Sequence, residues 1–272
     1  MNPSETSTPL TGFNPEIYDR YSVPIYFEPY ALDLFNRIDP APLKSVLEIA
    51  CGTGAVTRYL RKTLLPETKL VASDLSSDML EYAKKKLQNE KIEWVIADAC
   101  QLPFADDSFD LVVCQFGYMF APDKPKAFRE AYRVLRVGGS LLIATWDSIE
   151  FNEATQIVRG TFIKMFGGLP PESLLPFSMN DDHELKLLFE ASGFKDISVE
   201  HVLKNAVAAS AMDAATSAGR AGLMYNEIMK RNPSGLQKFI DTLFTEFKEE
   251  FGESPMIAQM QAVVCRGWKN RM

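Results

Sequence analysis

The chain contains 272 residues with a mass of 30.5 kDa, of which 46% are hydrophobic and 24% are charged. These values are those of an ordinary globular protein, so they exclude a chain that is disordered throughout. The formal net charge is −7, and the longest basic run is residues 84–86. Since a nucleic-acid-binding protein normally carries a basic stripe, we expect no nucleic-acid partner.

The sequence also lacks the marks of a membrane or secreted protein. No run of about 18 apolar residues occurs, and the N-terminus has neither the basic start nor the apolar run of a secretory signal. The four cysteines are far apart and form no CxxC pair: Cys51, Cys100, Cys114 and Cys265. This spacing favours reduced thiols over a disulfide framework or a zinc site. We therefore predict a cytoplasmic protein without a metal centre or a membrane span.

The N-terminal region divides into two segments. Residues 1–12 are rich in Ser, Thr and Pro, and we expect a disordered tail there. Residues 13–37 are strongly aromatic, and Pro15 and Pro24 occupy positions that are typical of helix starts. This second segment is predicted to form one or two short helices.

Five apolar runs then alternate with amphipathic stretches. The runs predict strands at residues 45–50, 69–73, 92–97, 109–114 and 140–146. The intervening stretches predict helices at 54–64, from Ser76 or Ser77 onward, and at 124–135, before a break at Gly138-Gly139. Because the strands are continuously apolar, they indicate a doubly wound α/β fold whose mostly parallel sheet is covered on both faces.

The pattern changes after residue 147. Helices are predicted at 153–166 and 182–192, an extended turn at Pro170-Pro171, and strands at 195–203 and 255–266. Residues 206–251 are predicted to be mostly helical. We expect a single domain over residues 13–272, with 13–37 and two helical insertions, 150–177 and 206–251, forming a cap over the substrate.

The chemistry is expected where the first predicted strand turns into a helix. Residues 46–54 have the sequence VLEIACGTG, in which glycines allow close approach to a ligand and the helix start offers free N–H groups. A dinucleotide fingerprint requires a further glycine where this chain has Thr57. Glu48 stands in an apolar strand, where a charge is costly without a partner. Asp74 ends the second strand, where it can accept hydrogen bonds from a ribose.

Five segments together resemble class I S-adenosylmethionine (SAM) dependent methyltransferases, in particular the ubiquinone/menaquinone-biosynthesis-type group of small-molecule methyltransferases. They are LEIACGTG (47–54), VASDLSSDML (71–80), IADACQLPFADDSFDLV (96–112), CQFGYMF (114–120) and RVLRVGGSLLIATW (133–146). Residues 18–31 are similar to the N-terminal helices of that group. The chain departs from the pattern at Ala50, where many relatives have glycine. The resemblance implies a seven-stranded Rossmann-like methyltransferase sheet with an antiparallel last strand.

The resemblance also implies the cofactor, SAM, and the residues that bind it. The loop and Glu48 would hold the methionine end, together with the backbone near Gln115 and Phe116. Asp74 would bind the ribose. Tyr18 and Tyr21 would close over the methionine end as a lid. Leu75 and Met79 would pack on the adenine ring, and residues 98–100 would contact its edge. The implied cofactor residues are Tyr18, Tyr21, Glu48, Ala50, Cys51, Gly52, Thr53, Gly54, Asp74, Leu75, Met79, Asp98, Ala99, Cys100, Gln115 and Phe116.

Several of these residues also have a purely structural explanation. Met79 lies on the apolar face of its predicted helix and would be buried in any case. Asp98 is a common turn former, and Asp74 could cap the helix that follows it. The N-terminal aromatic residues could simply pack on the sheet. The sequence leaves these alternatives open.

The acceptor site is less defined by the sequence. Methyl transfer mainly requires positioned reactants and a general base is optional, so no catalytic residue is identified. The two histidines, His183 and His201, are expected to face the solvent and not to act in catalysis. Apolar cap segments favour a small, largely apolar or aromatic metabolite, methylated at an O, N or C centre. We expect Tyr26, Tyr118, Trp146 and Asp147 in its pocket. The last three follow strand ends at the edge where open α/β sheets bind ligands.

Other functions remain open from the sequence. An NAD(P)-linked oxidoreductase would use a similar sheet, although Glu48 and the missing glycine argue against it. A non-catalytic relative could keep the SAM site as a sensor. A protein methyltransferase is disfavoured because no acidic channel for a basic peptide is visible. We expect a small-molecule partner and allow for a homodimer.

Overall fold

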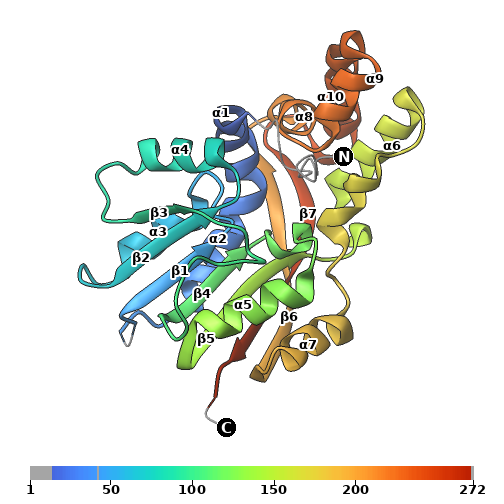
Figure 1. Ribbon diagram of the computed structural model, residues 1–272. Coiled ribbons are helices and arrows are strands. Elements are labelled where there is room, and N and C mark those ends of the chain that lie inside the picture. The colour runs from blue at the N-terminus through green and yellow to red at the C-terminus, as the bar shows by residue number, and fades with distance from the viewer. Residues whose placement is uncertain (1–13, 42, 271–272) are drawn as a thin grey trace, which may run out of the picture.

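Seven strands form one continuous sheet (Figure 1). They are β1 (Ser45–Ile49), β2 (Lys69–Asp74), β3 (Glu93–Ile96), β4 (Phe109–Gln115), β5 (Leu135–Trp146), β6 (Lys195–Ala208) and β7 (Met256–Trp268), in the spatial order β3-β2-β1-β4-β5-β7-β6. Neighbours among β1 to β5 are parallel, whereas β7 is antiparallel to both β5 and β6. The predicted fold class is confirmed.

The computed structural model describes residues 14–41 and 43–270, so the tail predicted at 1–12 lies outside the described residues. The central strands are buried because both of their faces are covered. Every residue of β1 is buried, and so are residues 111–114 of β4. Their continuous Val, Leu and Ile side chains form the middle of the core, as expected for a parallel sheet.

Helices cover the two faces of the sheet. Figure 1 shows α5 (Lys124–Val134) and α7 (Asp182–Ala191) on one face, with α2 (Glu28–Asn36) and α3 (Ala55–Thr63) on the other. The helix after β2 is α4 (Ser77–Lys86), and the hydroxyl of Ser76 caps it by accepting a hydrogen bond from the N–H of Met79 (3.3 Å). The apolar face predicted for α4 is buried, including Met79.

A further set of helices lies beyond the carboxyl ends of the parallel strands, at the top of Figure 1. We call this set the helical cap. Its first part contains a ten-residue π-helix, which is rare because π-helices are mostly single turns. The cap consists of α1 (Pro15–Ile17), the π-helix η1 (Tyr18–Phe27), α6 (Glu153–Phe166), η4 (Pro171–Phe177), α8 (Ala211–Arg220), α9 (Met224–Arg231), η5 (Pro233–Gly235) and α10 (Leu236–Phe251). Two short 3₁₀ turns, η2 (Tyr118–Phe120) and η3 (Ile149–Phe151), follow β4 and β5.

Three predicted boundaries are wrong. The break predicted at Gly138-Gly139 lies inside β5, because the N–H of Gly138 donates to the carbonyl of Lys269 (2.6 Å) and the N–H of Lys269 donates to the carbonyl of Gly139 (2.8 Å). β6 continues to Ala208, since its pairing with β7 also continues, so residues 206–208 are not helical. Pro170 is extended as predicted, but the 3₁₀ helix η4 begins directly at Pro171.

Several global features can be stated for the described residues only. None of their helices is both long enough and apolar enough to cross a membrane. No group of three or more His, Cys, Asp or Glu side chains among them is arranged to hold a metal ion. The four cysteines are free and buried. The assignment of residues 13–272 to a single domain remains a prediction.

Candidate functional site

The turn between β1 and α3 brings the predicted loop and Asp74 together. Ala50, Gly52 and Gly54 all have positive φ angles of 55°, 54° and 82°. The N–H of Gly52 donates to Oδ2 of Asp74 (2.7 Å), while the N–H of Ser76 donates to Oδ1 (2.8 Å). One carboxylate therefore fixes both the glycine loop and the start of α4.

Asp74 keeps capacity for a ligand after making these two bonds. A carboxylate offers about four lone-pair positions, and the two backbone N–H groups use one on each oxygen. Burial raises the pKa of Asp74, although hydrogen bonds from Ser76 and Gly52 lower it in part. Since Ser76 caps α4, Asp74 organises the turn before that helix rather than acting as its cap.

Glu48 is a buried carboxyl group at the carboxyl end of β1. Only 2% of the residue is exposed, and burial raises its pKa to about 8, with a further contribution from the nearby charge of Asp74. Its Oε2 atom has no hydrogen-bond partner among the described residues. An acidic side chain in this state favours a cationic partner, which would restore its charged form.

Other polar atoms around the loop are also buried without partners. Within the described chain, neither Oγ1 of Thr53 nor Oε1 of Gln115 has a hydrogen-bond partner. A methyl group added at Gly52 would meet no atom within 4 Å, so open space lies beside the loop. Because buried polar groups are normally hydrogen-bonded, these atoms indicate a polar ligand at this edge of the sheet.

These features fit the cofactor that the sequence resemblance implies. SAM carries an ammonium group, for which Glu48 and Gln115 supply acceptors, and a ribose diol, for which Asp74 supplies a carboxylate. The open side of Gly52 and the start of α3 suit its carboxylate. The residues present would therefore hold SAM, and the assignment of individual contacts remains a prediction.

The predicted adenine residues lie around the ends of β2 and β3. Leu75 is 48% exposed directly after Asp74, which leaves an aliphatic surface available for a flat ring. Met79 is buried on α4, so the structural explanation applies to it. Oδ1 of Asp98 accepts a hydrogen bond from the N–H of Cys100 (2.8 Å) across Ala99, so Asp98 forms a turn.

The loop packs so closely that one position has no room for a side chain. A methyl group added at Gly117 would lie 2.4 Å from Cβ of Ala50 and 2.7 Å from Sγ of Cys114. The departure of Ala50 from glycine is thus accommodated by a glycine after β4. Because Ala50 is held at positive φ, this position also carries strain of about 1–2 kcal/mol.

We expect Gly117→Ala to lower the free energy of unfolding by about 1–3 kcal/mol through overpacking. Adding Ala50→Gly should recover part of this loss, since it removes the methyl group that the new side chain meets. Urea unfolding of the two single variants and the double variant measures this coupling. Strictly additive effects would contradict the packing described here.

The π-helix η1 is tied across the cofactor edge by several polar contacts. Asp19 accepts a hydrogen bond from Nζ of Lys86 on α4 (2.6 Å), and Glu28, the first residue of α2 directly after η1, pairs with Arg58 on α3. Nε2 of Gln115 donates to the carbonyl of Phe27 (3.1 Å). Tyr18 and Tyr21 are both partly buried in this helix, and their role as a lid over the cofactor remains a prediction.

An aromatic cluster lies at the carboxyl ends of β4 and β5. Phe116 stacks on Trp146 with ring centroids 4.0 Å apart, and Phe27 and Tyr30 meet both rings edge-on. Phe116 adopts a positive φ of 54°, which is costly for a bulky residue. Such strain is often found at binding sites. The backbone at Phe116, predicted to contact the cofactor, is thereby turned at the end of β4.

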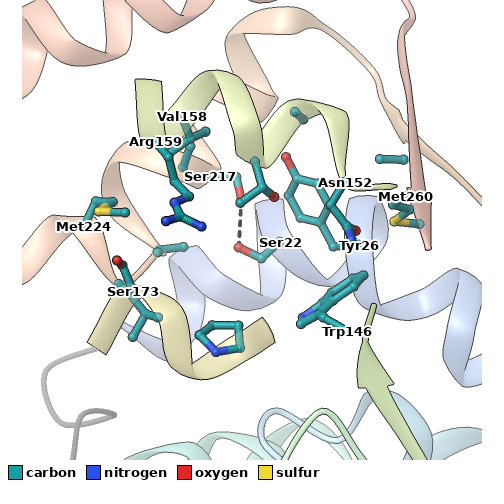
Figure 2. Close-up of a pocket in the computed structure, with 18 of the residues that line it drawn as sticks. Ser22, Tyr26, Trp146, Asn152, Val158, Arg159, Ser173, Ser217, Met224 and Met260 are labelled. Carbon is teal, nitrogen blue, oxygen red and sulfur yellow. Dashed lines mark hydrogen bonds between the residues drawn. The ribbon is translucent and has the colours of Figure 1, made fainter. Parts of the chain in front are cut away.

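A cavity of about 200 Å³ lies between η1, the end of β5 and the other helices of the helical cap (Figure 2). Tyr18, Tyr26 and Trp146, all predicted site residues, line it. Most of the lining is apolar, with contributions from Phe27, Val158, Phe177, Leu223, Met224 and Met260. The predicted residues from η1 and β5 are therefore brought together at one cavity.

Two predicted pocket residues do not line this cavity. Tyr118 is buried beside Phe128, with ring centroids 4.9 Å apart, and belongs to the core. Asp147 is buried and bonds to His201 Nδ1 (2.5 Å), which in turn bonds to Asp182 (2.9 Å). The hydrogen bond that the protonated ring donates to Asp147, opposed in part by desolvation, raises the pKa of His201. His201 is thus solvent-facing, as expected, but is held between two carboxylates.

The polar residues of the cavity were not identified from the sequence. Ser22 and Ser217 are joined by a buried hydrogen bond (2.8 Å), and Arg159 and Ser173 line the same space (Figure 2). They come from four different elements, η1, α8, α6 and η4. Only Arg159 left a local signal, as a cation on the same side of a predicted helix as the apolar positions 158 and 162.

Comparison with known proteins gives consistent similarities. The family described as "Methyltransferase domain" matches residues 47–143. The chain is 31% identical to the ubiquinone/menaquinone biosynthesis C-methyltransferase of Haemophilus ducreyi, over 61% of this chain and 70% of that protein. It is 38% identical to the enzyme of the same name from Hahella chejuensis, over 46% of this chain and 51% of that protein. The chain thus spans about half the length of this second relative.

A solved structure extends the similarity to most of the fold. The phosphoethanolamine N-methyltransferase 2 of Haemonchus contortus, in complex with phosphomonomethylethanolamine and S-adenosylhomocysteine, superposes with a TM-score of 0.56. The sequences are 19% identical, and the superposition covers 89% of this chain and 53% of that protein. At this identity the similarity concerns the fold.

Proposed function

This chain belongs to the family of SAM-dependent methyltransferases that includes the ubiquinone/menaquinone biosynthesis C-methyltransferases, and from that premise we propose that it methylates a small metabolite. The methyl donor is SAM, and the acceptor is a largely apolar or aromatic molecule with a reactive O, N or C centre. The enzyme class and cofactor expected from the sequence are those of the family. The alternative of an NAD(P)-linked oxidoreductase has no support from the relatives.

One observation supports this function most directly. Tyr18 lines the apolar cavity, and its phenol also lies close enough to Asp74 for that charge to contribute, after burial, to its raised pKa. Tyr18 therefore lies near both the cavity and Asp74, the carboxylate that we propose binds the ribose. A donor held by Asp74 and an acceptor held in the cavity would meet beside Tyr18.

The residues around the cavity favour positioning over proton abstraction. The described lining contains no His, Asp, Glu, Lys or Cys side chain. Burial raises the pKa of Tyr26 and Tyr18, so both phenols stay neutral and act as hydrogen-bond donors. When bound, SAM supplies an electrophilic methyl group on a sulfonium. The chain's contribution is to hold the acceptor in line and to exclude water, which is worth several kcal/mol.

This mechanism limits the acceptor. Since the described part of the cavity supplies no general base, the accepting atom must be nucleophilic without help, as a phenolate, an electron-rich ring carbon or an amine is. The relatives are named for ubiquinone and menaquinone biosynthesis. An aromatic ring acceptor is therefore the form of the proposal that we favour.

A labelled transfer experiment tests the function. We expect incubation with methyl-deuterated SAM and a metabolite extract to place a trideuteromethyl group on a small aromatic product, detected by mass spectrometry. The product should be absent when Asp74→Ala replaces the wild-type protein. Failure of SAM and of S-adenosylhomocysteine to bind at millimolar concentration would contradict the proposal.

The remaining expectations extend the proposal. We propose that residues 13–37, 150–177 and 206–251 form the substrate cap, since η1, α6, η4, α8 and α9 all contribute to the cavity wall. A cytoplasmic location is supported by four free cysteines. The absence of a nucleic-acid partner and the homodimer remain predictions, which filter binding and light scattering test.

A further inference from the structure

Arg159 is the one charged side chain in the described lining of the cap cavity. It extends from α6, and Figure 2 shows its guanidinium group directed into the cavity, between Ser173 and the Ser22–Ser217 pair in that view. The residue is only partly exposed, and it makes no hydrogen bond or ion pair with the described residues. The guanidinium group therefore has no counter-ion among the described residues of a mostly apolar cavity.

A second polar group points to the same ligand. Ser173 is 3% exposed and lines the same cavity, and its Oγ atom has no hydrogen-bond partner in the described chain. Buried hydroxyl groups normally find a partner. The hydroxyl can donate, as the guanidinium does, so the two residues together offer N–H and O–H donors to a negatively charged oxygen atom.

The size and charge of the cavity restrict this ligand. At about 200 Å³ the cavity exceeds the roughly 150 Å³ that accommodates benzene in an engineered protein. A single ring with one or two substituents fits such a space. One guanidinium balances one negative charge, whereas a phosphate ester carries about −1.5 to −2 at neutral pH and would leave charge uncompensated in an apolar site.

We propose that the acceptor is a small carboxylic acid, whose carboxylate group binds Arg159 and Ser173 while its apolar body points toward Trp146. This inference rests on the proposed function, because it names the substrate class of that site. It also explains how the cavity orients an acceptor: the charged end is fixed on α6 and η4, and the opposite end faces the aromatic cluster beside Tyr18. Planar guanidinium groups bind carboxylates in a defined geometry, which suits this role.

Binding of matched acids and amides tests the proposal. With the protein saturated by S-adenosylhomocysteine, calorimetry would measure benzoate, phenylacetate, 4-hydroxybenzoate and hexanoate against their neutral amides, with phenyl phosphate as the alternative anion. We expect at least one carboxylate to bind ten-fold or more tightly than its amide, since hydrogen bonds to charged groups are the strong ones. This preference should fall below three-fold in Arg159→Met. Ser173→Ala should lower the affinity of the protein for the same acid.

A matched control separates this role from a general effect of charge or folding. Lys164→Met removes a cation from the same helix, where Lys164 is exposed and pairs with Glu246 (3.3 Å). It should keep the full preference for the acid. Arg159→Met should keep the melting temperature and the affinity for S-adenosylhomocysteine of the wild type, because Arg159 supports neither the fold nor the cofactor edge.

The other possible results contradict either the proposed substrate class or the proposed function. Equal binding of every acid and its amide, a preference that survives in Arg159→Met, or tighter binding of phenyl phosphate than of benzoate would overturn the inference while leaving the methyltransferase proposal intact. If the wild-type protein fails to bind S-adenosylhomocysteine at all, the proposed function itself is wrong. The two failures are therefore distinguished within one experiment.

Discussion

Replacing Asp74 by alanine is expected to weaken the binding of S-adenosylhomocysteine by at least 100-fold. The carboxylate can accept bonds from two ribose hydroxyls, and each hydrogen bond to a charged group is worth about 1.5–3 kcal/mol. Its removal also releases the N–H of Gly52 from the 2.7 Å bond that holds the glycine loop. Isothermal titration of the variant and the wild type measures the change.

The structural part of this effect needs its own control. Ser76→Ala removes the cap of α4, the neighbouring support of the same turn, without touching the carboxylate. This variant should be less stable by about 1 kcal/mol and should bind the ligand almost as tightly as the wild type. Wild-type affinity in Asp74→Ala, with its fold verified by circular dichroism, would contradict the assignment of Asp74 to the ribose.

Glu48→Gln is expected to stabilise the free protein and to weaken ligand binding. The pKa of Glu48 rises from 4.5 to about 8 on burial, so between these values the folded protein holds a proton that the unfolded chain has lost. The free energy of unfolding must then decrease as the pH rises through this range. Glutamine does not ionise, so the variant should lack this decrease and be more stable at pH 8 by about 4 kcal/mol.

Ligand binding should change in the opposite direction. If the carboxylate of Glu48 pairs with the ammonium group, binding at pH 7 must release its proton, and affinity must rise with pH up to about 8. In Glu48→Gln both the proton release and this rise should disappear. Calorimetry in buffers of different ionisation enthalpy measures the released proton.

Glu93→Gln is the matched control, since Glu93 is exposed at the start of β3 and pairs with Lys69 (2.8 Å). It should leave the pH dependence of both stability and binding unchanged. The account of Glu48 would be wrong if wild-type stability did not fall between pH 5 and pH 8, or if ligand affinity were independent of pH in that range.

The parts of this fold that the sequence predicts well are those that short-range patterns determine. The strands at 45–50 and 109–114 are mostly apolar without alternation, because helices cover both faces of a parallel sheet. Asp74 and the glycine loop could be placed together because the carboxyl ends of neighbouring parallel strands meet at one edge. The start of α4 directly after Ser76 follows from the capping preference of serine.

The features that were missed depend on residues far apart in the sequence. Gly138 and Gly139 continue β5 because Lys269, about 130 positions later, supplies their backbone partners. Asp147 is directed away from the cavity by His201, and no local pattern links these residues. Arg159 could not be identified as a site residue from local sequence, because the residues beside it in the cavity, Ser173, Ser22 and Ser217, come from three other elements.

The crystal structure of the protein with S-adenosylhomocysteine tests the central claim most directly. We expect the ligand along the carboxyl ends of β1, β2 and β4, with both ribose hydroxyls within hydrogen-bonding distance of the Asp74 carboxylate and the ammonium group beside Glu48. Its sulfur atom should face the cavity near Tyr18. A ligand bound elsewhere, or a ribose that makes no bond to Asp74, would contradict the account.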